Sequence, residues 1–181
     1  MVSHLSLVLG GVRSGKSAFA EGLAGQDERP VLYLATGMAV DEEMEERIRR
    51  HQESRPAHWT TVEEPMDLAG PLTEATGSVL IDSLDAWLGN MMFEHKYSDT
   101  EEIEQSVLLR LEAFLKVIDK ATAEFTVVSS EVGLSMVPIE LVGRRFQDIL
   151  GTINQRVAAQ ADRVFMVVAG IPTQIKGPSL K

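Results

Sequence analysis

Short apolar runs alternate with longer amphipathic segments along the chain. Five runs are apolar at successive positions, which predicts strands buried on both faces: LSLVLGG (5–11), PVLYLAT (30–36), SVLIDS (78–83), FTVVSSE (125–131) and RVFMVVAG (163–170). HWTTVEE (58–64) predicts a further short strand. Because the runs alternate with helical segments, the pattern predicts the α/β class, with a mostly parallel sheet and helices on both faces.

The segments between the runs have helical periodicity. Helices are predicted over residues 17–25, 40–55, 84–95, 100–121 and 140–161. In the second of these, Val40, Met44 and Ile48 recur every four residues, beside three Glu–Arg pairs spaced four apart. Residues 171–181 are expected to form a tail. No repeat, low-complexity tract or linker interrupts the chain, so residues 1–181 are expected to form a single catalytic domain.

Composition narrows the class of protein. Hydrophobic residues make up 44% and charged residues 24%, which is typical of a globular protein. The 17 basic residues against 27 acidic ones give a net charge of −10, which disfavours nucleic acid as a partner. Since there is no cysteine, disulfides, thiolate zinc sites and iron–sulfur clusters are excluded. No stretch approaches the roughly 18 apolar residues of a membrane span, and no signal peptide is recognisable, so a cytoplasmic location is expected.

A phosphate-binding motif lies between the first predicted strand and the first predicted helix. The segment GGVRSGKS fits G-x-x-x-x-G-K-[ST], and its residues are Gly10, Gly11, Val12, Arg13, Ser14, Gly15, Lys16 and Ser17. Glycines let successive backbone N–H groups surround a phosphate, and the helix N-terminus favours the anion. Lys16 would bind the β- and γ-phosphate oxygens, and Ser17 would be a ligand of Mg²⁺. A glycine-rich turn that matches by chance is the alternative.

Two acids follow apolar strands. Asp82 ends SVLID and is the natural candidate for the acid that holds Mg²⁺ together with Ser17. An acid just before a helix is also a common N-cap, so a purely structural role stays open. Glu131, which ends FTVVSSE, is a weaker candidate for the same function.

The motif leaves two classes of nucleotide-binding protein. The chain has no N-K-x-D segment for reading guanine and is small for a motor ATPase. A small-molecule kinase or nucleotidyltransferase is therefore the leading class. A nucleotide-binding switch or assembly module without transferase activity is the alternative.

His51 lies near the end of the helix predicted over 40–55. At about 100° per residue it falls on the face of Val40 and Ile48, which predicts a packed histidine with one hydrogen bond. Yet the helix follows the end of the second strand, and the arginines at 47, 49, 50 and 55 suit a polyphosphate. A neutral imidazole beside a nucleotide can attack phosphorus. The residues alone leave both interpretations open.

Five segments together resemble the bifunctional adenosylcobinamide kinase / adenosylcobinamide-phosphate guanylyltransferase family of cobalamin biosynthesis. They are GGVRSGKS, VLYLATG, DEEMEERIRRHQESRPAHWTTVEE, SSEVGLSMVP and RRFQDILGTINQRVAAQADRVFMVVAGIP, and the similarity runs from about residue 5 to residue 176. The resemblance implies a RecA-like P-loop fold and a homotrimer. It also implies phosphorylation of adenosylcobinamide by ATP or GTP, then transfer of GMP from GTP through a histidine–GMP intermediate with release of pyrophosphate.

The resemblance also implies particular site residues. The guanylylated histidine of the family corresponds to His51, and Lys16 belongs to the catalytic loop. Outside that loop, the implied nucleotide-binding positions are Thr36, Gly37, Met38, Gln52, Glu53, Ser54, Arg55, Glu63 and Asp82. The corrinoid is the partner implied, and its pocket is not identified by the sequence. His58, beside Trp59, is expected to pack rather than react.

Overall fold

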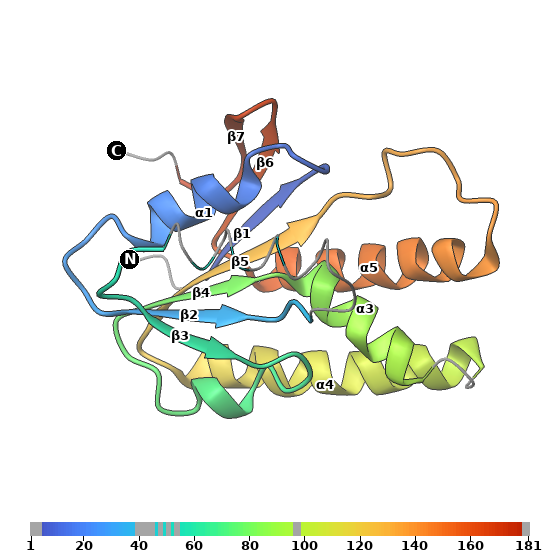
Figure 1. Cartoon of the computed structure of the whole chain (residues 1–181), viewed down its shortest axis with the longest axis horizontal. Helices are drawn as coiled ribbons and strands as arrows, with labels where there is room; N and C mark the ends of the chain where they lie inside the picture. The colour runs from blue at the N-terminus through green and yellow to red at the C-terminus, as the bar shows by residue number, and fades with distance from the viewer. Residues whose placement is uncertain are drawn as a thin grey trace.

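The computed structural model describes residues 5–38, 46, 49, 52, 55–95 and 99–178. Over these residues, seven strands form one sheet in the order β3-β2-β4-β5-β1-β6-β7 (Figure 1). The strands are β1 (Leu5–Gly10), β2 (Val31–Ala35), β3 (Thr60–Glu63), β4 (Ser78–Asp82), β5 (Glu124–Ser130), β6 (Arg163–Val168) and β7 (Ile171–Lys176). All neighbouring strands run parallel except β6 and β7. The predicted α/β class with a mostly parallel sheet is confirmed.

The prediction of a tail over residues 171–181 is wrong for its first half. Ile171–Lys176 form β7, which pairs antiparallel with β6 at the edge of the sheet. The reversal occurs at Ala169 and Gly170, both of which have positive φ angles, 52° and 79°. The segment IPTQIK is largely exposed and has no apolar run, so it lacked the signal that identified the buried strands.

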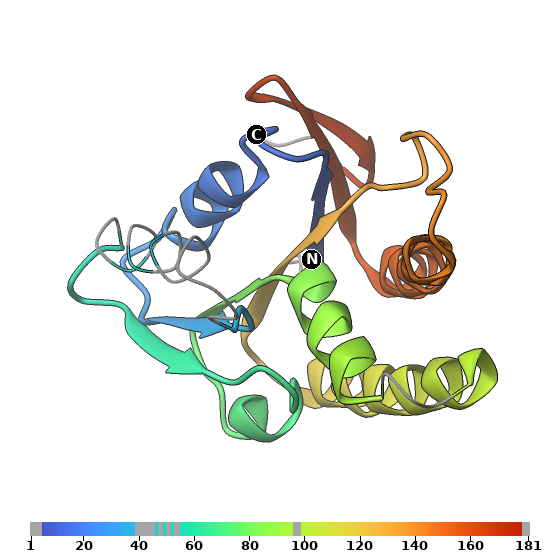
Figure 2. The same ribbon diagram turned by 45° about the vertical axis from the view of Figure 1, so that its right-hand side comes forward.

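Helices cover both faces of the sheet. α1 (Lys16–Ala24) lies on one face, and α3 (Leu84–Glu94), α4 (Thr100–Lys120) and α5 (Leu141–Gln160) lie on the other (Figures 1 and 2). A short 3-10 helix, η1 (Gly70–Leu72), precedes β4. Within the described part of the chain, none of the helices combines the length and apolarity needed to cross a bilayer.

The two faces have separate apolar clusters. The larger one lies under α3, α4 and α5 and includes Trp87, Phe114 and Leu150, all fully buried. The smaller lies under α1 and includes Tyr33 and Phe165. Buried apolar side chains on both faces explain why the strands are apolar at successive positions.

Only part of the helix predicted over 40–55 can be compared with the structure. Residues 46, 49 and 52 are helical, and Arg49 forms an ion pair with Glu46, with its Nη2 at 2.6 Å from the carboxylate. Val40, Met44 and Ile48, which defined the periodicity, lie outside the described residues.

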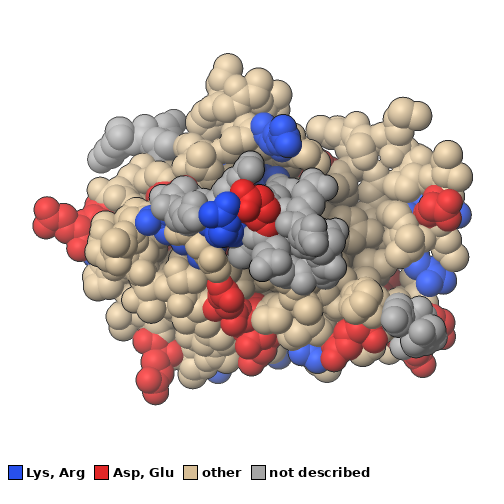
Figure 3. Space-filling view, viewed as in Figure 1, with Lys and Arg blue, Asp and Glu red and all other residues tan. Residues whose placement is uncertain are grey.

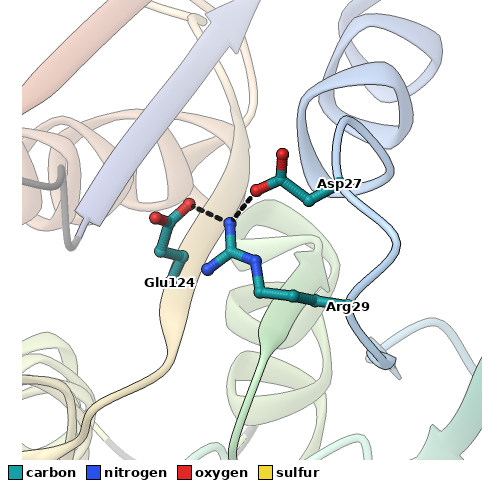
Figure 4. A network of polar contacts seen from close by, with 3 residues as sticks. All are labelled: Asp27, Arg29 and Glu124. Atoms are coloured by element: carbon teal, nitrogen blue, oxygen red, sulfur yellow. Dashed lines mark hydrogen bonds and ion pairs between the residues drawn. The ribbon is translucent and has the colours of Figure 1, made fainter.

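An arginine ties the loop after α1 to the amino end of β5. Arg29 forms ion pairs with Asp27 and with Glu124, the latter at 2.9 Å (Figure 4). The hydrogen bond to Glu124 is the main reason that the pKa of Arg29 is raised. Exposed ion pairs contribute little free energy, so this contact fixes the position of the loop more than it stabilises the fold.

Buried polar side chains hold the opposite end of β5. Asn154 of α5 accepts a hydrogen bond from the Ser129 hydroxyl at 2.7 Å and donates one to the Ser130 carbonyl at 3.0 Å. Asp85 of α3 accepts from the Ser130 amide and hydroxyl, at 3.1 and 2.9 Å. The carboxyl end of β5 is therefore fixed to two helices.

Acidic and basic side chains are mixed on the face drawn in Figure 3. Acidic groups lie at its left, lower and right parts, and the basic groups near its middle lie beside an acidic one. The net charge of −10 therefore coexists with basic side chains on the same face.

Truncation of a buried and of an exposed apolar side chain on α4 should differ sharply in its effect on stability. Phe114 is 0% exposed and Leu109 is 71% exposed on the same helix. We expect Phe114→Ala to lower the free energy of unfolding by about 3–5 kcal/mol, because it leaves a cavity. Leu109→Ala should change it by less than about 0.5 kcal/mol. Urea titration followed by circular dichroism measures both; equal losses would contradict the assignment of the helix face.

Candidate nucleotide-binding site

The carboxyl ends of the inner strands bring the candidate residues to one edge of the sheet. Gly10 at the end of β1 pairs with Ser130, and Ala35 at the end of β2 lies beside Asp82 and Glu63. Open α/β sheets bind ligands at this edge. The candidate site therefore forms at the carboxyl ends of the strands, where the phosphate-binding motif and Asp82 lie.

The phosphate loop has the backbone shape that the motif requires. Gly15, the N-cap of α1, has a φ angle of 91°, and Arg13 has one of 56°. Helix α1 begins at Lys16, and no side chain caps it. Its first N–H groups have no intrahelical acceptor, so they are available to an anion.

The turn between β6 and β7 packs directly against this loop. The Gly170 amide donates a hydrogen bond of 2.8 Å to the Ser14 carbonyl. A Cβ atom on Gly10 would lie 2.4 Å from the Ser14 hydroxyl and 2.7 Å from the Val167 carbonyl, so no side chain fits there. A Cβ atom on Gly15 would lie 3.2 Å from the Gly170 Cα. Gly10 is therefore required by close packing, and Gly15 by its positive φ angle together with the close approach of Gly170.

Lys16 and Ser17 lie as a phosphate site requires. The Lys16 ammonium group reaches back over the loop to within 3.4 Å of the Gly11 carbonyl. The Ser17 hydroxyl lies 3.4 Å from Asp82 Oδ1, across the gap between α1 and β4. The two candidate Mg²⁺ ligands are thus brought together.

The helix-capping alternative for Asp82 is answered by its neighbour. Ser83 is the N-cap of α3, and its hydroxyl accepts a hydrogen bond of 3.4 Å from the Ala86 amide. The carboxylate of Asp82 instead points to Ser17 and Tyr33. Asp82 therefore does not serve as the cap.

Tyr33 connects Asp82 with Arg55, and sequence reasoning missed it. Its hydroxyl donates a hydrogen bond of 2.8 Å to Asp82 Oδ2, and the Arg55 guanidinium lies 3.8 Å above its ring centroid. Burial, and then the charge of Asp82, raise the pKa of Tyr33. The available signal was a tyrosine within an otherwise aliphatic strand, but its partners become visible only through the register of β2 on β4.

The side chain of Thr36 forms hydrogen bonds with backbone groups. It is fully buried, its hydroxyl donates to the Ser83 carbonyl at 2.7 Å, and the Ser83 amide donates back to it at the same distance. Its carbonyl accepts from Asn90 of α3 at 2.7 Å. Gly37 and Met38 follow it and are exposed. Thr36 thus fixes the end of β2, while its two successors face solvent.

The segment around the candidate nucleophile is described only in part. Gln52 donates a hydrogen bond to Glu63 at the end of β3, and Arg55 covers Tyr33. His51, Glu53 and Ser54 lie outside the described residues. Two of the positions that follow His51 in the chain therefore contact the end of β3 and the middle of β2.

Two further residues were considered from the sequence, Glu131 and His58. Glu131 follows β5 and accepts a hydrogen bond of 2.7 Å from the Gly133 amide. His58 is exposed, so the prediction that it packs is wrong; only its neighbour Trp59 packs, with its ring centroid 6.4 Å from that of Tyr33.

The donor set fits a magnesium ion that is held jointly with a nucleotide. Among the described residues, no group of three or more acidic or histidine side chains could hold a metal alone. Magnesium commonly takes one or two protein ligands and completes its shell with water and phosphate oxygens. Ser17 and Asp82 supply that number of ligands.

Comparison with known proteins gives a match along nearly the whole chain. The family described as "Cobinamide kinase / cobinamide phosphate guanyltransferase" matches residues 6–175. A "Bifunctional adenosylcobalamin biosynthesis protein CobP" of Pseudomonas aeruginosa is 40% identical, over 96% of this chain and 98% of the relative. Proteins named "Bifunctional adenosylcobalamin biosynthesis protein CobU" from Escherichia coli and Salmonella typhimurium are 36% identical, over 94% of this chain and 98% of each relative.

Solved structures are more distant. The RadB recombinase superimposes with a TM-score of 0.49 at 15% identity, over 91% of this chain and 74% of that one. An ATPase of a bacterial type III secretion system gives a TM-score of 0.49 at 10% identity, over 90% of this chain and 50% of that one.

The buried tyrosine should give the protein a measurable sensitivity to alkali. Because the pKa of Tyr33 is raised above its ordinary value of 10.0, its contribution to stability is fully present below that pH and is lost as pH rises toward the folded-state value. Above pH ~10, the wild type should lose up to about 1.4 kcal/mol per pH unit more than Tyr33→Phe does. Denaturant unfolding at a series of pH values measures the difference. Parallel pH profiles would contradict it.

Proposed function

We infer that the chain, which belongs to the cobinamide kinase / cobinamide phosphate guanyltransferase family, is a bifunctional enzyme of adenosylcobalamin biosynthesis. It phosphorylates adenosylcobinamide and then transfers GMP to the product, adenosylcobinamide phosphate. The observation that carries this conclusion is the family match over residues 6–175, which includes a phosphate loop whose Ser17 lies against Asp82.

In the kinase step, the loop residues Gly10–Ser17 hold the triphosphate of ATP or GTP. Lys16 and the first N–H groups of α1 stabilise charge on the transferred phosphoryl group. Mg²⁺, held by Ser17 and Asp82, would neutralise phosphate charge and orient the β- and γ-phosphates. The substrate hydroxyl attacks the γ-phosphorus as the bond to the β–γ bridging oxygen breaks, and the nucleoside diphosphate leaves.

In the guanylyl transfer, His51 is the nucleophile. A bond forms between its imidazole nitrogen and the α-phosphorus of GTP, and pyrophosphate leaves. An oxygen of cobinamide phosphate then attacks the same phosphorus, and the nitrogen–phosphorus bond breaks. The contacts of Gln52 with Glu63 and of Arg55 with Tyr33 support this role, because Glu63 ends β3 and the Tyr33 hydroxyl donates to Asp82.

The two steps act on different ends of the triphosphate. One bound nucleotide cannot present its γ- and α-phosphorus atoms to the same acceptor, so the nucleotide or the segment that carries His51 is repositioned between steps. Nucleotide contacts from Thr36, Gly37, Met38, Gln52, Glu53, Ser54, Arg55 and Glu63 complete the proposed site. The whole chain would work as a single domain in the cytoplasm, where nucleoside triphosphates are available.

Replacing the nucleophile should separate the two activities. His51→Ala should abolish the covalent GMP adduct and GMP transfer, while phosphorylation of adenosylcobinamide stays largely intact. Incubation with Mg²⁺ and GTP labelled at the α-phosphorus, followed by denaturation, measures the adduct as acid-labile, base-stable label. A labelled His51→Ala protein would contradict the assignment and make His58 the next residue to test.

Two variants serve as controls. Lys16→Ala should slow both steps on the order of 10²-fold, since each begins with a triphosphate in the loop and one such contact is worth about 3 kcal/mol or more. His58→Ala should keep the adduct. A wild-type protein that binds GTP but takes up no label would instead favour a plain kinase or a nucleotide-binding module.

The oligomeric state is a separate proposal. We expect a homotrimer, because a bulky corrinoid at an open strand-end site needs shielding, and because Ile139, Leu141 and Val142 leave exposed apolar surface before and at the start of α5. Light scattering at micromolar concentration should then give about three times the chain mass of 19.9 kDa. A monomeric mass would refute the proposal.

A further inference from the structure

A cleft of about 500 Å³ lies against the outer side of the phosphate loop. One wall is the loop itself, residues 11–14, and the second is the end of β6 with the turn that follows it, residues 166–169. The third wall comes from the segment after β5, through Glu131, Leu134 and Ser135. In Figures 1 and 2 this segment runs from the end of β5 toward α5, beside the phosphate loop.

The cleft shares the phosphate loop with the proposed nucleotide site, because residues 11–14 form one of its walls. Asp82, Tyr33 and Arg55, which belong to the proposed nucleotide site, do not line it. A substrate in this cleft would therefore lie next to a phosphate held by the loop, as a transfer between two substrates requires.

The walls of the cleft carry apolar side chains and a carboxylate, which suit an alcohol on a large, mainly uncharged body. Val12, Leu134 and Val168 are exposed by 83%, 83% and 63%, although each is apolar. Arg13 and Glu131 both line the cleft, one of each charge, and the Glu131 carboxylate can accept a hydrogen bond from a hydroxyl group. Its Oε1 is held by the Gly133 amide, and no described residue donates to Oε2.

A second polar group in the wall lacks a partner. Ser14 is 7% exposed and lines the cleft, and its buried hydroxyl makes no hydrogen bond within the described part of the chain. Buried hydroxyls without a partner are uncommon, and a ligand that supplies one would satisfy it.

We propose that this cleft receives the hydroxyl-bearing arm and the adjoining ring edge of cobinamide, with Glu131 accepting the hydrogen bond of the reacting hydroxyl. The assignment rests on the proposed kinase function. As the oxygen–phosphorus bond forms, the hydroxyl proton passes to the Glu131 carboxylate, and the electrons of the broken bond leave with the nucleoside diphosphate. The rest of the corrinoid lies over the apolar side chains that continue from the rim, Met136 and Val137, which are 91% and 73% exposed.

Direct binding tests the location without turnover. Equilibrium dialysis with cobinamide, read by the visible absorption of the corrin, compares the wild type with Leu134→Arg and Leu109→Arg. Both leucines are exposed, at 83% and 71%, but Leu109 lies on α4 and does not line the cleft. We expect Leu134→Arg to weaken binding roughly tenfold or more, and Leu109→Arg to leave it unchanged. Equal binding by the wild type and both variants would overturn the proposal.

Kinetics test the part assigned to Glu131. Glu131→Gln keeps the shape of the side chain but accepts a proton poorly, so kcat of the kinase step should fall roughly 10²-fold. The KM for the nucleotide and the amount of GMP adduct should not change, which also shows that the variant is folded. An unchanged kinase rate would overturn the role of Glu131.

Measurements on the wild type distinguish a failure of the proposed function from a failure of the proposed cobinamide site. A wild-type protein that neither binds nor phosphorylates cobinamide would contradict the proposed function itself. A wild type that does both, with Leu134→Arg indistinguishable from it, would contradict only the location of the cobinamide site.

Discussion

The close contact at Gly10 is the constraint on which the site depends. Any side chain there would overlap the Ser14 hydroxyl and the Val167 carbonyl, so the loop can turn at this point only because the residue has no Cβ. The Gly170 amide then holds the Ser14 carbonyl from the other side. The loop is thus clamped between its own strand and the turn after β6, and its free N–H groups keep their direction without a bound anion.

A second constraint is a series of side-chain contacts that starts at Asp82. One carboxylate oxygen meets Ser17 and the other meets Tyr33, whose ring supports Arg55. Asp82 is half-buried, and a carboxylate that is partly removed from water needs partners of this kind, because desolvation without them is costly. The acid that would hold the metal is therefore coupled to the segment that follows the proposed nucleophile. This coupling offers a physical route by which the two half-reactions affect each other.

The phosphate loop and the buried strands could be predicted from the sequence, because each is identified by a short contiguous segment. The phosphate loop is contiguous, and the buried strands are apolar on both faces, so the period and the glycines identify them. The role of Tyr33 was not accessible, since it depends on how β2 registers against β4. The capping question for Asp82 stayed open because Asp82 and Ser83 are adjacent and both are common N-cap residues. β7 was missed because an exposed edge strand has no apolar run. The cleft joins Val12, Leu134 and Val168, which are far apart in the chain and share no pattern.

The position of β1 has a consequence for how the protein is made. Among the described strands, β1 comes first in the chain, yet its neighbours in the sheet are β5 and β6. Leu5 lies opposite Phe125, and Ser6 lies opposite Arg163. Domains begin to fold during synthesis, but pairing over such separations waits for the later segment to exist. The phosphate loop, which directly follows β1 in the chain, therefore acquires its shape among the last parts of the molecule. A nascent chain interrupted before residue 163 would carry the whole motif and have no strand on one side of it.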